Sequence, residues 1–345
     1  MQAIPYEFHS AFNDDYNLVT RKILRMLSEN SRMHISEISD AIGLSRRSIR
    51  ERIIRMEKEL GVRYTVEFDE EALGLTSPHL TLIQFKKKPD YGTISAQLSR
   101  SYVPQLAASL KGPESMFMYS VAASSRDYVH WDNAMTIALS PYGAKWHTSE
   151  LVHKQLGFFP LRSEVLDRLK IEPKHKEMLK LLNSNARISF QEFAARLGTH
   201  FNTVAYNFNK LLKEGYIRRF TIAFDRPKDV TLAAFFAKYT PLEGFERHAL
   251  KVRRAFQADD ENSLVSRYIV CAPLIGSYDH FGIGAFDSFG SAYKHISSYH
   301  RQVLGDHLGE ISCREVDRVL LGSLPIRSID TKRDYKTIEW TSDIK

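Results

Sequence analysis

The chain repeats a two-part pattern, and this internal duplication constrains its fold more than any other feature of the sequence. Residues 28–43, SENSRMHISEISDAIG, align without gaps with residues 183–198, NSNARISFQEFAARLG, at an offset of 155 residues. Further along, residues 129–146 resemble residues 276–293, at an offset of 147 residues. Because both similarities occur in the same order, we predict a module of about 150 residues that is present twice.

The first part of each module has the pattern of three helices and a β-hairpin. In the first copy, helical periodicity covers residues 15–29, Ser36 is the expected N-cap of a short helix, and Ser45 caps a third helix that runs to Leu60. Residues 62–68 then alternate as a strand does. Two helices joined by a short turn with a glycine are typical of a helix-turn-helix. The second copy repeats the pattern from Pro173 to residue 224.

The second part of each module has the order βαββαβ, which is typical of a ferredoxin-like domain. In the second copy the strands are expected at 231–240, 265–272, 280–286 and 310–322, with helices at 245–257 and 291–304. In the first copy we expect strands at 79–85, 116–123, 135–139 and 159–166, and helices at 93–110 and 144–156, the former ended or kinked by Pro104.

The predicted fold class is therefore α+β, with two winged helix-turn-helix domains alternating with two ferredoxin-like domains. The expected divisions are a first helix-turn-helix at 14–70, a first ferredoxin-like domain at 76–168, a second helix-turn-helix at 170–226, a second ferredoxin-like domain at 229–325 and a tail at 326–345.

The third helix of the first copy is rich in arginine. On a helical wheel Ile49, Ile53, Met56 and Leu60 form one narrow face, which we expect to be buried. The second helix of a helix-turn-helix enters the major groove with its N-terminal half, and arginine binds both guanine and phosphate. We therefore predict DNA contacts from the opposite face. The candidate residues are Ser45, Arg46, Arg47, Arg50 and Arg55. The alternative is a solvated helix stabilised by pairs such as Glu51 with Arg55.

The equivalent helix of the second copy keeps the apolar face and carries fewer charges. Phe201, Val204, Phe208 and Leu211 form its apolar stripe. Asparagine can bind adenine through two hydrogen bonds, so a second reader with a different base preference is plausible. Its candidate DNA contacts are Asn202, Thr203, Tyr206 and Lys210, with Arg218 and Arg219 on the wing. The alternative is a diverged copy that is kept for packing. Two unlike helices in one chain would favour a non-palindromic site.

A winged helix-turn-helix followed by a βαββαβ domain resembles the Lrp/AsnC family of transcription regulators. The resemblance depends on residues 15–75 and on the turn GSYDHFGIGAF at 276–286. It implies DNA-binding regulation, assembly through the sheet domains and an amino-acid-like effector near that turn. The matching effector residues are Gly276, Tyr278 and Asp279, whereas the first copy has Val129, Trp131 and Asp132. Alternatively, Gly276 only supplies a turn position with positive φ.

No sequence motif of a hydrolase, metalloprotease, nucleotide-binding or dinucleotide-binding enzyme is present, so we expect no catalytic residues, no metal, no cofactor and no enzymatic activity. One enzymatic alternative is a siroheme decarboxylase, because these enzymes resemble the same two-part architecture. Such chemistry would need histidine and arginine around a tetrapyrrole. A third possibility is an architectural nucleoid protein, which would bind DNA without sequence preference.

Composition indicates the cellular compartment and the partners that we expect. The net charge of +7 is compatible with a polyanionic partner, although a mildly basic surface also serves solubility. The two cysteines, Cys271 and Cys313, form no CxxC pair, and no signal peptide or membrane span is visible, so we predict a cytoplasmic protein associated with the nucleoid. The expected partners are double-stranded DNA, an amino-acid-like effector and a second copy of the chain, in addition to an internal pseudo-dimer of the two modules.

Overall fold

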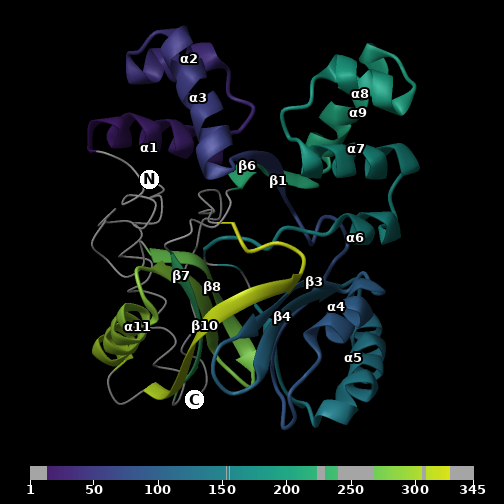
Figure 1. Ribbon diagram of the computed structural model, residues 1–345. Helices are drawn as coiled ribbons and strands as arrows, with labels where there is room; N and C mark the ends of the chain where they lie inside the picture. The colour runs from purple at the N-terminus through teal and green to yellow at the C-terminus, as the bar shows by residue number, and fades with distance from the viewer. Residues whose placement is uncertain are drawn as a thin grey trace, which may run out of the picture.

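Two three-helix units lie side by side above an eight-stranded β-barrel in the computed structural model (Figure 1). The structure describes residues 14–326 except 153, 155, 224–229, 240–266 and 305–307. The first unit contains α1 (Asp14–Glu29), α2 (Ile35–Ile42) and α3 (Arg46–Leu60). The second contains α7 (Pro173–Ser184), α8 (Phe190–Leu197) and α9 (Phe201–Lys213). The expected helix that begins at Pro173 and both helix-turn-helix pairs are thus present.

Polar caps set the helix boundaries. Ser45 caps α3 as predicted, since its hydroxyl oxygen accepts a hydrogen bond of 3.2 Å from the backbone N–H of Ser48. The predicted N-cap of α2 is wrong: the cap is His34, whose backbone N–H donates to the Glu37 carboxylate at 2.7 Å, and Ser36 lies inside the helix. In the second copy the equivalent position is Ser189, which caps α8.

The strands that follow the two helical units pair with each other. Strands β1 (Arg63–Phe68) and β6 (Ile217–Ala223) form a two-stranded antiparallel sheet in which Thr65 lies opposite Thr221. The hairpin that we expected within each copy is therefore replaced by a strand pair between the copies. Ile222 of β6 is buried in the core of the first helical unit, and Val66 of β1 is buried in the cluster that contains Val204 of the second, so each copy contributes to the other's core.

Two arginines exchange hydrogen bonds between the helical units. Arg32 donates from Nη1 to the carbonyl oxygens of Ala186 at 2.6 Å and Ile188 at 3.2 Å. Arg187 donates to the carbonyl oxygens of Ser31 and Met33. Arg32 and Arg187 are equivalent under the offset of 155 residues, as are the residues that accept their bonds. The exchange therefore follows a local pseudo-twofold axis.

Backbone and threonine hydrogen bonds repeat the same symmetry. The N–H of Ser31 donates to Phe220 O at 3.0 Å, and the N–H of Ala186 donates to Tyr64 O at 3.1 Å. The hydroxyl groups of Thr65 and Thr221 each donate to a carbonyl near the end of the other copy's first helix. These matched pairs fix the two helical units in one relative orientation.

The closed barrel is built from both copies. The first copy supplies β2 (Ser77–Gln84), β3 (Pro104–Leu110), β4 (Ser115–Ala122) and β5 (Lys145–Leu151). The second supplies β7 (Thr231–Tyr239), β8 (Tyr268–Gly276), β9 (His280–Phe286) and β10 (Leu308–Leu321). Their order is β10-β3-β4-β2-β5-β8-β9-β7, so the β5–β8 and β10–β3 pairs join the copies.

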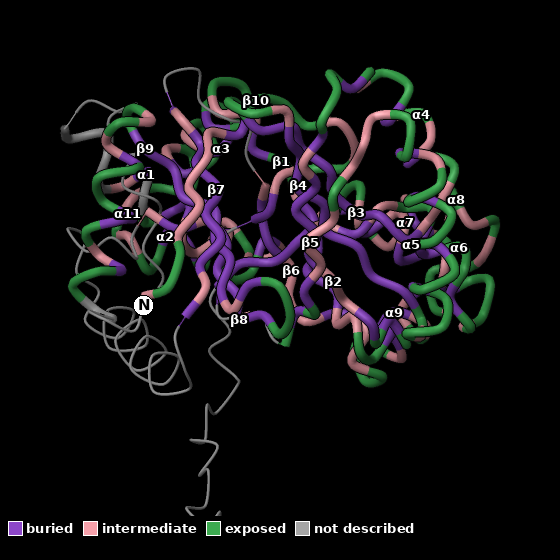
Figure 2. Tube along the Cα trace, turned by 90° about the horizontal axis from the view of Figure 1, so that it is seen from below, coloured by how far each residue is buried: buried purple, intermediate pink, exposed green. Residues whose placement is uncertain are grey.

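Aromatic and aliphatic side chains from both copies fill the barrel. The Phe281 ring packs against Phe117 at 5.7 Å and against Phe236 at 5.0 Å between ring centroids. Seen from below, the barrel strands are largely buried, and exposed residues concentrate on the surrounding helices (Figure 2). The outer helices are α4 (Tyr91–Ser99), α5 (Ser125–Leu139) and α11 (Phe289–Leu304), while α6 (Ser163–Arg168) leads to the second helical unit.

Several elements of the first copy differ from the sequence-based expectation. Residues 104–110 form a strand rather than the end of a helix, residues 135–139 belong to α5, residues 145–151 form a strand, and residues 163–168 form a helix. The buried residues of α5 have helical spacing, and they are Tyr128, Trp131, Met135 and Leu139. We missed this spacing because we relied on the alignment at offset 147. The helix expected at 245–257 and most of the C-terminal tail lie outside the described residues.

The alignment that paired residues 129–146 with 276–293 is also wrong. Residues 125–139 form α5, whose structural counterpart is α11, whereas residues 276–279 form the turn between β8 and β9. The counterpart of that turn lies between β3 and β4, where Gly112 has a φ of 105°. Val129, Trp131 and Asp132 are therefore helical residues and do not form a second effector turn. Among the helices of the described ranges, none combines the length and apolar character of a membrane span.

The reciprocal hydrogen bonds of Arg32 and Arg187 predict that removing either side chain destabilises the fold. We expect Arg187→Ala to lower the free energy of unfolding by about 2–4 kcal/mol, because buried carbonyl groups lose charged donors. Arg187→Lys should recover little of the lost stability, since an ammonium group cannot reproduce the several hydrogen bonds of the planar guanidinium group. The control is Arg196→Ala, which removes only an exposed pair with Glu192 and should change stability by less than about 0.5 kcal/mol. Equal denaturation midpoints for the two alanine variants would contradict the assigned role.

The buried histidine of α11, His300, predicts that the fold loses stability in acid. Burial lowers the pKa of His300 to about 4, and its Nδ1 lies 2.7 Å from the Ile296 carbonyl oxygen. The unfolded chain therefore binds this proton more readily than the folded one. Stability should rise with pH between about 4 and 6.5 and fall by up to about 3 kcal/mol on acidification through that range. His300→Gln should flatten the pH profile of the unfolding midpoint. The exposed His295→Gln is the matched control, and identical slopes for wild type and His300→Gln would refute the assignment.

Candidate nucleic-acid interface

Helix α3 presents arginine on the face opposite its core. Ile49, Ile53 and Met56 are buried as predicted, with exposed fractions of 0, 4 and 2%, whereas Leu60, expected on the same face, is half-buried. Arg46, Arg47, Arg50 and Arg55 are exposed. The cap at Ser45 places three of these arginines in the first turns of the helix. The arrangement has the geometry of a recognition helix, with one face buried in the domain core and exposed cations on the opposite face.

Two glutamates partly balance this charge. Arg47 Nε lies 2.9 Å from Glu51, and Arg55 Nε lies 2.8 Å from Glu59. The hydrogen bond to Glu51 raises the pKa of Arg47. Glu51 thus pairs with Arg47, four residues before it. The side chain of Arg47 is 89% exposed, so water screens this pair and phosphate can replace the carboxylate.

Helix α9 presents a different surface on the same scaffold. Val204, Phe208 and Leu211 are buried, as the helical period predicts. Phe201, which we placed in the apolar stripe, is instead 50% exposed. On the outer face Asn202 is exposed, Tyr206 is 69% exposed and Thr203 is half-buried.

Lys210 is engaged within the protein. Its Nζ lies 2.6 Å from Glu172 and 3.8 Å from Glu214, and the hydrogen bond to Glu172 raises its pKa. Both carboxylates reduce the positive charge that Lys210 offers to a phosphate. Of the four candidates on α9, the structure leaves Asn202 and Tyr206 the most accessible.

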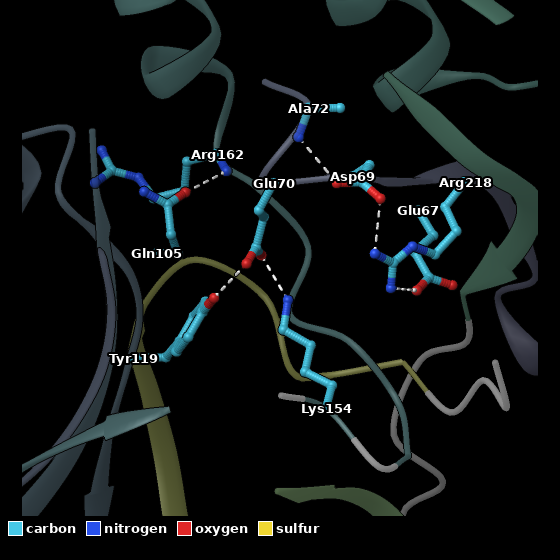
Figure 3. Close-up of polar contacts among 9 residues, drawn as sticks. All are labelled: Glu67, Asp69, Glu70, Ala72, Gln105, Tyr119, Lys154, Arg162 and Arg218. Carbon is cyan, nitrogen blue, oxygen red and sulfur yellow. Dashed lines mark hydrogen bonds and ion pairs between the residues drawn. The ribbon is translucent and has the colours of Figure 1, made fainter. Parts of the chain in front are cut away.

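The two arginines that we assigned to a wing lie in the sheet between the copies. Arg218 Nη2 lies 2.8 Å from Asp69, and Arg219 Nε lies 2.8 Å from Glu67. Both carboxylates belong to the first copy (Figure 3 shows Arg218 and Asp69). The exposed fractions of the two arginine side chains are 21 and 12%. These cations hold β6 against β1, so we no longer assign them to the DNA contact.

Beyond β1, polar contacts join the helical units to the barrel. Glu70 accepts a hydrogen bond of 2.8 Å from the hydroxyl group of the buried Tyr119 and one of 2.6 Å from Lys154 (Figure 3). Burial raises the pKa of Tyr119, which keeps its hydroxyl a donor. The Arg162 N–H donates to Gln105 at 2.8 Å nearby. No local pattern in the sequence indicates these contacts, because the partners are distant in the chain.

The turn proposed for an effector is held by internal contacts. Asp279 accepts from Lys238 Nζ at 3.0 Å and from the N–H of Tyr239 at 2.7 Å. The N–H of Tyr278 donates to Ser149 Oγ at 3.0 Å, which ties the turn to β5 of the first copy. Tyr278 is 7% exposed. A ligand amine at Asp279 would have to replace Lys238.

Gly276 is required by backbone geometry. Its φ is 141°, and a Cβ at this position would lie 2.8 Å from the carbonyl oxygen of Thr148 and 3.0 Å from the Cα of Ser149. Any side chain would push β8 away from β5. The sequence-based alternative, that this glycine supplies a special turn position, therefore has a clear structural basis.

Family models match the two helix-turn-helix regions. The AsnC-type helix-turn-helix domain matches residues 20–57, and a winged helix-turn-helix DNA-binding domain matches residues 171–218. The chain therefore carries two DNA-binding domains of the winged helix-turn-helix class. The resemblance to the Lrp/AsnC family is confirmed, and the first domain is of the AsnC type. None of the curated proteins matches the sequence.

Several solved structures are similar to this chain over most or part of its length. The siroheme decarboxylase NirDL is 12% identical, with a TM-score of 0.57, over 90% of this chain and 94% of its own. B. subtilis LrpC is 22% identical over 39% of this chain and 93% of its own, with a TM-score of 0.33. The transcriptional regulator NMB0573 from Neisseria meningitidis, solved with L-Met, is 17% identical over 39% of this chain and 89% of its own, with a TM-score of 0.34.

The likeness to NirDL corrects one expectation. We expected no enzymatic activity because the sequence lacks the common catalytic motifs. An enzyme shares the fold over nine-tenths of this chain, so missing motifs are no argument against catalysis on this scaffold. At 12% identity the likeness shows a common fold and assigns no chemistry to this chain.

Proposed function

We propose that the protein is a sequence-specific transcription regulator that binds double-stranded DNA through two non-identical helices, α3 and α9. The observation that carries the proposal is the exposed arginine surface on the N-terminal half of α3, within an AsnC-type helix-turn-helix. Arg47 and Arg50 are the first candidates for base and phosphate contacts, since both are exposed at the start of the helix.

The two helices would contribute differently to DNA binding. Helix α3 carries the cations and would supply most of the phosphate neutralisation. Helix α9 carries Asn202 and Tyr206 at its accessible positions and would add base preference with less affinity. An architectural protein without sequence preference would not need this division, so discrimination between duplexes separates the two proposals.

Other features of the proposal follow from the Lrp/AsnC resemblance. They are an amino-acid-like effector at Gly276, Tyr278 and Asp279, assembly of two chains into a dimer, the domain divisions given above, and action in the cytoplasm beside the nucleoid. The contacts of Asp279 require that such an effector rearrange the turn, because Lys238 already occupies the carboxylate.

A second candidate function is decarboxylation of a siroheme-like tetrapyrrole, favoured by the fold shared with NirDL. Alternation along the strands directs His147 of β5 and Arg314 of β10 toward the barrel interior, where Leu151 and Val316 are buried. Within the described part of the chain, His147 Nε2 and Arg314 Nε are buried without a hydrogen-bond partner. These groups could bind propionate or acetate side chains.

The tetrapyrrole candidate predicts that purified protein incubated anaerobically with siroheme retains a Soret band and yields product lighter by the mass of CO₂. Arg314→Ala should weaken retention, because the guanidinium group would bind a carboxylate. Arg126→Ala, on the outer helix α5, is the control. Unchanged siroheme mass and no retained absorbance would reject this candidate.

The regulator proposal predicts a difference in salt dependence between two double variants. Arg47→Ala with Arg50→Ala should weaken duplex binding by about 30-fold or more and make the slope of log K against log salt shallower by about 1–2. Asn202→Ala with Tyr206→Ala should weaken binding less and leave the slope nearly unchanged. The measurement is fluorescence anisotropy with a selected duplex at several salt concentrations. Wild-type affinity in the arginine variant would overturn the assignment of α3.

A further inference from the structure

Helix α9 begins with an exposed phenylalanine, which lies at the N-terminal end of the helix's apolar stripe, where the rest of the stripe is buried. Phe201 is the first helical residue after the N-cap His200, and half of its surface is exposed to solvent. Exposure of a large apolar ring forgoes the free energy that its burial would contribute, about 25 cal/mol per Å². The ring is therefore a candidate contact for an apolar partner group.

Comparison with α3 shows which property changed at this position. Under the offset of 155 residues, Phe201 takes the place of Arg46. Asn202 takes the place of Arg47, and Ala205 takes the place of Arg50. Helix α9 lacks these arginines, and its N-cap His200 makes no side-chain capping hydrogen bond as Ser45 does in α3, while the buried stripe is kept. The second helix thus offers an apolar ring and an amide at the positions where the first offers guanidinium groups.

The ring of Phe201 is supported from one side. It packs edge-on against Phe190 of α8, with ring centroids 5.7 Å apart. Phe190 in turn lies 5.0 Å from the ring of Phe208, and the guanidinium of Arg32 lies over it at 5.7 Å. Phe190 thus links the ring of Phe201 to Arg32 and so to the contact between the copies. Little conformational entropy would be lost when the ring of Phe201 meets a ligand.

We propose that α9 binds an A·T-containing half-site and that Phe201 packs against the 5-methyl group of a thymine. In the major groove thymine is distinguished by this methyl group, and phenylalanine is one of the side chains that contact it. Asn202, the next residue, has the amide that pairs with adenine. This inference rests on the proposed DNA-binding function and adds the base class to it.

The test replaces thymine by uracil, which removes the methyl group and leaves every hydrogen-bonding group of the base edge in place. A duplex is selected by the full-length wild-type protein, and each thymine under α9 is then changed to uracil in turn. Wild-type affinity should fall about fourfold at the contacted position, the effect of exposing one buried methyl group. Equal affinity for every thymine and uracil duplex would overturn the inference, whereas failure to select any duplex would overturn the proposed function.

Variants then assign the effect to one side chain. Phe201→Ala should bind the thymine and uracil duplexes equally, while Phe201→Leu should keep part of the preference and shows that the helix still folds. The matched control is Arg46→Ala at the equivalent position of α3, which should keep the full thymine preference and make the salt slope shallower. A thymine preference that survives in Phe201→Ala would place the methyl contact elsewhere and refute the assignment.

Discussion

The exchange of hydrogen bonds between Arg32 and Arg187 is the constraint on which the arrangement of this protein depends. Each guanidinium group donates to backbone carbonyl groups of the other copy. Burial and the neighbouring charge of Arg187 lower the pKa of Arg32, so the pair is kept together at an electrostatic cost. The surrounding hydrogen bonds and the β1–β6 sheet offset that cost. The result is one rigid orientation of α3 and α9 in a single chain.

Because the two copies are held together by this interface, their outer surfaces can diverge without disrupting the contact between them. Some residues at the contact between copies keep their type, as Arg32 and Arg187 or Thr65 and Thr221 show. The outer residues do not, and arginines on α3 become Phe201, Asn202 and Ala205 on α9. The same fold is found in an enzyme, so the scaffold permits more than one chemistry and function depends on which surfaces carry reactive or binding groups.

The sequence predicted the helical units well because their buried residues follow the period of a helix. Ser45 caps α3 as predicted, whereas the cap of α2 was misplaced. The prediction also placed the second half of the first barrel domain incorrectly, since the apparent repeat at offset 147 outweighed the helical spacing of Tyr128, Trp131 and Met135. Among the candidate contacts, the arginines of α3 lie on the surface as expected. Arg218 and Arg219 do not, because their carboxylate partners are about 150 residues away in the chain and no local pattern reveals them.

We propose that one chain presents two different DNA-reading helices in a fixed orientation. The decisive experiment is hydroxyl-radical footprinting of a complex with one chain per duplex. We expect a single binding orientation with a non-palindromic footprint, strong protection of the backbone under α3 and weaker protection under α9. A symmetric footprint, or equal occupancy of both orientations on the selected duplex, would contradict the proposal.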